Sequence, residues 1–146
     1  MARYVAVVGP GEASAEQCAI AEQVGRQLAG RGAVLVSGGL GGAMEAACRG
    51  AREAGGTTVG ILPGFDRAAA NEFVDVALPT GLGEARNALV VRAADVLIAI
   101  GGGFGTLSEI ALALKSGKRV IGVGTWEIDG IETTDSAERA VDLALA

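Results

Sequence analysis

Glycine-rich turns constrain this chain more than any other feature of its sequence. Three of them, Gly9–Glu12, Ser37–Glu45 and Gly101–Thr106, each lie between an apolar run of strand length and a helical pattern. Glycine supplies 24 of the 146 residues, but the copies cluster without a fixed period, which fits neither collagen nor a flexible linker. Clustered glycine between apolar runs is typical of tight turns and of places where the backbone approaches a ligand closely.

Apolar runs and amphipathic stretches alternate along the whole sequence. We expect strands over residues 3–8, 33–36, 57–62, 73–78, 95–100 and 119–123. We expect helices over residues 14–29, 42–54, 84–93, 106–115 and from 135 or 136 to 145, with polar loops at 65–72 and 127–134. Ser14 and Gln17 have the spacing of a capping box at the start of the first helix. Alternation at this spacing indicates parallel strands joined by right-handed crossovers. The prediction is a single Rossmann-like α/β domain over residues 1–146, doubly wound, with a mainly parallel sheet and helices on both faces.

The glycine-rich turns are expected to line one crevice, because all strand-to-helix turns of a parallel sheet lie at the same edge. A helix N-terminus presents free N–H groups and about half a positive charge there, and glycines let these groups close around a phosphate. No glycine run is followed by Gly-Lys-Ser or Gly-Lys-Thr, and no GxGxxG follows the first strand, so neither a P-loop nor a standard dinucleotide site is predicted. The functional interpretation is a phosphorylated, nucleotide-like ligand, and the alternative is a set of tight turns without a ligand.

Composition excludes several classes of function. The formal net charge of −5 argues against nucleic-acid binding, which needs a basic surface. Histidine is absent, which removes the Ser–His triad and the commonest metal ligand, so no metal site is expected. Cys18 and Cys48 fit as small buried residues rather than as a disulfide framework. With no signal peptide and no run long enough to span a membrane, a cytoplasmic protein is expected.

Two charged residues have both a functional and an ordinary interpretation. Glu109 follows Thr106 in the order Thr-Leu-Ser-Glu, which reads either as a capping box or as an acid–base carboxylate at the phosphate pocket. Arg86, beside Asn87 at the start of the third expected helix, reads either as a solvated helix arginine or as a guanidinium directed at phosphate.

The segment Gly102–Glu109 resembles the GGxGTxxE motif of the LOG family, and Ser37–Glu45 resembles that family's upstream glycine loop. Arg86 sits where those proteins carry an arginine paired with the motif glutamate. The resemblance implies a Rossmann-like fold and cleavage of the N-glycosidic bond of a nucleoside 5′-monophosphate. It also implies that Arg86 and Glu109 form the catalytic pair and that the glycine loop with Thr106 holds the phosphate.

The chain departs from LOG enzymes in ways that favour another branch of the same superfamily. Gly101 stands where LOG enzymes usually carry proline, and the chain is shorter. In these respects it looks more like the small molybdenum-cofactor carrier proteins, which bind a phosphorylated pterin without known chemistry. The superfamily also contains the DNA-processing protein DprA, whose role does not fit the acidic charge of this chain.

The sequence therefore supports two candidate functions. The first is a carrier or sensor of a phosphorylated pterin or nucleotide, with the molybdenum cofactor as the carried ligand, and the second is a LOG-type phosphoribohydrolase. The residues expected to contact the ligand are Gly9, Gly38, Gly39, Gly41, Gly42, Met44, Arg86, Asn87, Gly102, Gly103, Phe104, Gly105, Thr106 and Glu109.

The run Ile110–Leu114 is apolar nearly all round its expected helix, whereas a surface helix needs only one apolar stripe. We therefore expect a homo-oligomer, a dimer or tetramer, with this helix or the preceding one at the interface. The alternative is that its small alanines lie beneath neighbouring loops.

Overall fold

A seven-stranded, entirely parallel sheet forms the centre of the molecule, in the order β4-β3-β2-β1-β5-β6-β7. The computed structural model describes residues 1–146. The strands are β1 (Tyr4–Val8), β2 (Val34–Ser37), β3 (Thr58–Leu62), β4 (Val76–Pro79), β5 (Val96–Ile100), β6 (Arg119–Val123) and β7 (Ile131–Thr134).

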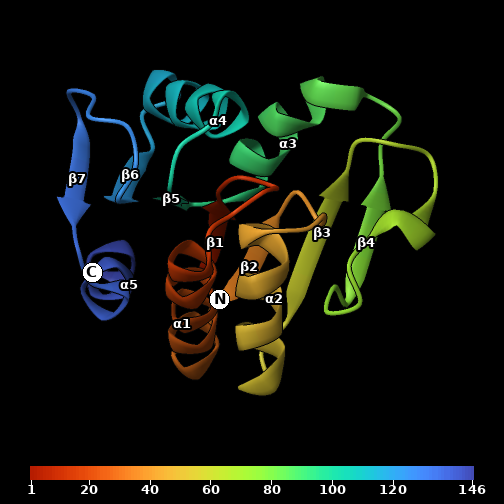
Figure 1. Cartoon of the computed structure of the whole chain (residues 1–146), viewed down its shortest axis with the longest axis horizontal. Coiled ribbons are helices and arrows are strands. Elements are labelled where there is room, and N and C mark those ends of the chain that lie inside the picture. The colour runs from red at the N-terminus through yellow and green to blue at the C-terminus, as the bar shows by residue number, and fades with distance from the viewer.

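Helices cover both faces of this sheet (Figure 1). On one face lie α1 (Ala15–Gly30), α2 (Ala43–Glu53) and α5 (Ala137–Leu145), and on the other lie α3 (Arg86–Ala93) and α4 (Phe104–Lys115). This arrangement confirms the predicted doubly wound, Rossmann-like α/β fold. No helix combines the length and the apolar character needed to cross a membrane.

The central strands are apolar along their whole length because both of their faces are buried. In β1, Val5 and Val7 pack under α1, α2 and α5, whereas Ala6 and Val8 pack under α3 and α4. Parallel strands covered on both faces read as continuous apolar runs in this way. The pattern explains why these strands could be predicted from sequence.

Strand order reverses between β1 and β5, the two strands from which the chain winds in opposite directions. Gly9 follows β1 and Gly101 follows β5, so two of the glycine-rich turns leave the sheet at this reversal. Open α/β sheets bind ligands in the crevice at such a point, beyond the carboxyl ends of the strands. The fold therefore brings the glycine turns to the position where a ligand site is expected.

Several boundaries differ from the sequence-based expectation, including the start of α3 at Arg86 rather than residue 84. The stretch 127–134 contains β7, which was expected to be a loop, because its residues are polar and only half-buried at the sheet edge. β7 is held there by pairing with β6 and by the ion pair between Arg119 and Glu132 at 2.8 Å. β4 begins at Val76 rather than residue 73, and α4 begins at Phe104 rather than residue 106.

Helix α1 begins as predicted. The Ser14 side chain accepts a hydrogen bond from the Gln17 backbone, and the Gln17 side chain accepts one from the Ser14 backbone, which completes the capping box.

Both cysteines are free; Cys48 is buried and Cys18 is half-buried.

Lys118 holds the carboxyl end of α3, and its removal should destabilise the fold. Its ammonium donates to the backbone oxygens of Val91 at 2.7 Å, Arg92 at 3.2 Å and Ala94. Because hydrogen bonds from a charged donor contribute about 1.5–3 kcal/mol, we expect Lys118→Met to lower the free energy of unfolding by about 2 kcal/mol in urea denaturation. The exposed Lys115→Met is the control and should change it by less than about 0.5 kcal/mol. Equal effects of the two substitutions would contradict this role.

Candidate functional site

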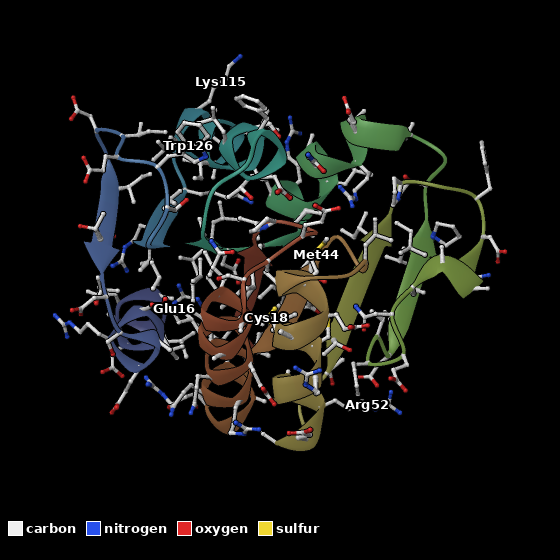
Figure 2. All side chains as sticks on the ribbon, viewed as in Figure 1. Glu16, Cys18, Met44, Arg52, Lys115 and Trp126 are labelled. Carbon is white, nitrogen blue, oxygen red and sulfur yellow. The ribbon has the colours of Figure 1, made fainter.

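A cavity of about 280 Å³ opens at the reversal point between β1 and β5. The first glycine turn, the second glycine loop, the start of α3 and the start of α4 all contribute to its wall. Met44 contributes from the first turn of α2, at the end of the helix nearest α3 (Figure 2). Its lining residues are Val8, Gly9, Pro10, Gly11, Gly38, Met44, Arg86, Asn87, Gly103, Gly105, Thr106 and Glu109.

Most of the residues predicted from sequence meet in this cavity. The structure brings together Gly9, Gly38, Met44, Arg86, Asn87, Gly103, Gly105, Thr106 and Glu109. Val8, Pro10 and Gly11 were not predicted individually, although Pro10 and Gly11 belong to the first glycine turn, whose presence was the available signal.

The remaining predicted residues do not line the cavity. Gly39, with φ +77°, and Gly42, with φ +64°, are packed against the backbone: an added Cβ would lie 3.2 Å from Gly60 and 2.4 Å from Pro10, respectively. Gly41 and Gly102 also lie outside it, and Phe104 faces a neighbouring cavity. For Gly39 and Gly42 the absence of a side chain is explained by packing, which sequence alone could not distinguish from ligand contact.

The N-terminus of α4 is open toward the cavity. Its N-cap is Gly103, at φ +133° and without a side-chain cap. The N–H groups of Phe104, Gly105 and Thr106 donate to no group of the chain, as is normal for a first helical turn, and Gly105 and Thr106 line the cavity. Such a terminus carries partial positive charge and is suited to bind a phosphate or another anion.

Glycines let the other walls come close to this terminus. A Cβ on Gly9 would lie 2.7 Å from the Cβ of Ala43 and 2.9 Å from the oxygen of Ile100. A Cβ on Gly38 would lie 2.7 Å from a guanidinium nitrogen of Arg86 and 2.8 Å from the sulfur of Met44. A larger residue at Gly38 would have to displace Arg86 or Met44, which line the cavity, whereas one at Gly9 would clash with Ala43 and Ile100 behind it.

Arg86 is fixed in place at the start of α3. Its Nε donates to the oxygen of Ile61 at 2.9 Å, one terminal nitrogen donates to the oxygen of Gly38 at 3.4 Å, and the other donates to Oδ1 of Asn87. The alternative of a freely solvated helix arginine is therefore wrong. Burial lowers the pKa of Arg86, and the nearby Glu109 carboxylate opposes that shift. A guanidinium remains charged at neutral pH, so Arg86 supplies a positive charge to the cavity.

Asn87 links α3 to the glycine turn of α4. Its side-chain nitrogen donates to Oγ of Ser108 at 3.2 Å, and that hydroxyl donates to the oxygen of Gly105 at 2.7 Å. Because Asn87 is buried, these bonds set the position of α4 relative to Arg86. The free N–H groups at the start of α4 and the cationic side chain are thus held in a fixed relation.

Glu109 faces the cavity without a hydrogen-bond partner in the chain. It is 7% exposed and lies in the second turn of α4, because the helix begins at Phe104. The predicted alternative, a capping box between Thr106 and Glu109, is therefore wrong: the N-cap is Gly103. Burial raises the pKa of Glu109 to about 7, although the positive charge of Arg86 acts in the opposite direction. A carboxyl group with this pKa can accept or donate a proton near neutral pH.

Arg86 and Glu109 are the charged side chains that line the cavity. No group of His, Cys, Asp and Glu in the structure could hold a metal ion. What the arrangement offers chemically is an anion site of backbone N–H groups, one fixed cation and one carboxyl group that titrates near neutral pH.

The fold and this cavity define a class of Rossmann-like proteins with a glycine-lined cavity at the reversal point of a parallel sheet. Residues 2–145 match the model of the SLOG cluster4 family, and the chain belongs to that family.

Three relatives show where the chain lies within this group. The molybdenum cofactor binding protein of Rippkaea orientalis superposes with a TM-score of 0.93 at 39% identity, covering 98% of this chain and 95% of that one. The molybdenum cofactor carrier protein of Chlamydomonas reinhardtii gives a TM-score of 0.88 at 34% identity and covers 99% of both chains. A cytokinin riboside 5′-monophosphate phosphoribohydrolase of Mycobacterium tuberculosis is 35% identical over 127 residues, which are 80% of this chain and 68% of that protein. The superfamily resemblance predicted from the glycine loops is thus confirmed.

Proposed function

We propose that this protein is a carrier or sensor of a phosphorylated small molecule with a pterin- or nucleotide-like ring, and that the molybdenum cofactor is the carried ligand. The observation that carries the proposal is the open N-terminus of α4, whose N–H groups at Gly105 and Thr106 line the cavity. The similarity to a molybdenum cofactor binding protein and a carrier protein over nearly the whole chain supports it.

The residues present suit the phosphate end of such a ligand. The first turn of α4 would take the phosphate oxygens, and Arg86 would balance part of their charge. A cavity of about 280 Å³ is close to the lower end of the range for small-molecule sites, about 300 Å³. No group of three or more His, Cys, Asp and Glu side chains could hold a metal ion, so the fit of the ligand rests on its phosphate end.

A phosphoribohydrolase is the second candidate, and Glu109 is the observation that favours it. Cleavage of an N-glycosidic bond builds positive charge on the ribose, which a nearby carboxylate stabilises while it also activates water. Glu109 is buried beside the cavity, has its pKa raised to about 7 and lies near the Arg86 charge. Arg86 would anchor the phosphate and keep part of the carboxyl population ionised.

Native mass spectrometry and an activity assay together distinguish the two candidates. We expect protein purified without added ligand to carry a phosphorylated pterin or nucleotide, and we expect incubation with AMP to release no adenine. Release of adenine and ribose 5-phosphate would replace the carrier proposal with the enzyme. A protein without bound ligand and without a phosphate-dependent rise in melting temperature would contradict both.

We further propose that residues 1–146 act as one cytoplasmic domain that assembles into a homo-oligomer through α3 and α4. Leu89 of α3 is 38% exposed and Leu114 of α4 is half-buried, so both helices present apolar surface to solvent. Sedimentation should show a dimer or tetramer at micromolar concentration, and a monomer would contradict the assembly.

A further inference from the structure

A second cavity, of about 470 Å³, adjoins the first. It lies between the start of α3 and the start of α4, and Asn87 and Gly105 line both cavities. Phe104, Ser108 and Leu112 form its α4 wall. A ligand whose phosphate rests on the first turn of α4 could therefore extend past Gly105 into this second space.

Phe104 is exposed at the mouth of this cavity. Its side chain is 83% exposed, an unusual position for a large apolar group at the first position of a helix. One side of the ring is stacked on Trp126, with 6.2 Å between the ring centroids and 28° between the ring planes. The stacked pair thus places an exposed aromatic ring beside the free N–H groups of the first turn of α4.

Trp126 is held in place rather than free to rotate. Its Nε1 donates to the oxygen of Gly103 at 3.1 Å, so the indole is tied to the glycine turn itself. It lies beside α4 (Figure 2). This bond restrains the indole that backs Phe104, so Trp126 loses little further freedom when a ligand ring stacks on Phe104.

We propose that Phe104, backed by Trp126, is the platform on which the planar heteroaromatic ring of the ligand stacks, while its phosphate rests on the N–H groups of Gly105 and Thr106. The inference rests on the proposed function and deepens it: the ligand class is a phosphorylated fused-ring compound, pterin or purine, and not a simple sugar phosphate. Stacking suits both kinds of ring, because every such ring has a π-face.

The test compares ligands with and without a ring on the full-length protein. The probes are GMP, 6-hydroxymethylpterin phosphate and ribose 5-phosphate, with affinities from calorimetry. The wild type should bind at least one of the two ring-bearing probes about tenfold or more tightly than ribose 5-phosphate, the scale expected for one stacked ring. Trp126 is the single tryptophan of the chain, so binding of the ring should also change the intrinsic fluorescence.

Phe104→Ala should weaken the ring-bearing probe about tenfold and leave ribose 5-phosphate within about twofold, because the backbone N–H groups remain. Phe104→Tyr keeps the π-face and should retain the wild-type preference. Phe65→Ala is the matched control: Phe65 is 89% exposed and lines neither cavity, so its removal should change no affinity.

The outcomes separate the platform from the proposed function. Equal loss for all probes in Phe104→Ala, or no loss for any, would overturn the platform while leaving the phosphate site in place. A change of oligomeric state in Phe104→Ala without a ring-selective loss would overturn it too, since Phe104 would then cover a second copy of the chain. A wild type that binds none of the probes would overturn the proposed function and the platform together.

Discussion

Gly105→Val should weaken binding of a phosphorylated ligand by about 100-fold or more and leave the fold intact. Gly105 lies in the first turn of α4 and lines the cavity, and a branched side chain there would cover the N–H groups that are expected to bind phosphate. Loss of two hydrogen bonds to a charged group, each contributing about 1.5–3 kcal/mol, accounts for the size of the effect. A Cβ at this position would meet its nearest neighbour, Nδ2 of Asn87, at 3.9 Å, so the substitution fits the folded backbone.

The affinity for GMP, measured by calorimetry, and the melting temperature test this prediction together. Gly64→Val is the matched control, because a Cβ on Gly64 would meet nothing within 4 Å and Gly64 does not line the cavity. Gly103 is a poorer choice, because its φ of +133° would strain any other residue whatever the ligand does. If the folded Gly105→Val protein kept the wild-type affinity for GMP, phosphate binding at the N-terminus of α4 would be contradicted.

Glu109→Gln should stabilise the protein at pH 8.5 and have little effect at pH 4. Burial raises the pKa of Glu109 from 4.5 to about 7, so between these values the folded protein holds a proton that the unfolded chain has released. Stability contributed by the protonated group is therefore present below about pH 4.5 and lost as the pH rises through about 7. The shift corresponds to about 3 kcal/mol above pH 7, a cost that a neutral glutamine avoids.

Urea denaturation at several pH values measures this effect, with Glu127→Gln as the control because Glu127 is exposed and forms no ion pair. Destabilisation by Glu109→Gln at high pH would mean that a charged Glu109 is held by a favourable partner, against the burial argument. The same variant decides the role of Glu109 in the second candidate function. A phosphoribohydrolase would lose about 100-fold or more in rate, the usual scale of general acid–base catalysis.

Much of the fold could be predicted because the signals were local. Continuous apolar runs mark strands buried on both faces, and the capping box at Ser14 marks the start of α1. The strand β7 could not be predicted in the same way, since Ile131–Thr134 is only half-buried and is ordered by its neighbour β6. An edge strand such as β7 has a weak apolar pattern, because its faces are less buried than those of a central strand such as β5.

The candidate site was predictable as a region but not in detail. Glycine spacing indicated which turns would meet, yet Gly39 and Gly42 proved to be packed against backbone while Gly38 lines the cavity. These glycines look alike in sequence, because the difference depends on which segment lies opposite. The raised pKa of Glu109 likewise depends on tertiary packing, since its main cause is burial in the folded chain.

The hydrogen bonds of Arg86 should affect the association rate of the proposed ligand. Because the guanidinium is already held by the oxygens of Ile61 and Gly38 and by Asn87, its rotational freedom is lost during folding and not at the moment of encounter. On the proposed function, an incoming phosphate would meet a guanidinium that needs no rearrangement, so association should approach the rate set by diffusion and orientation. Differences in affinity between competing ligands should then lie in their residence times.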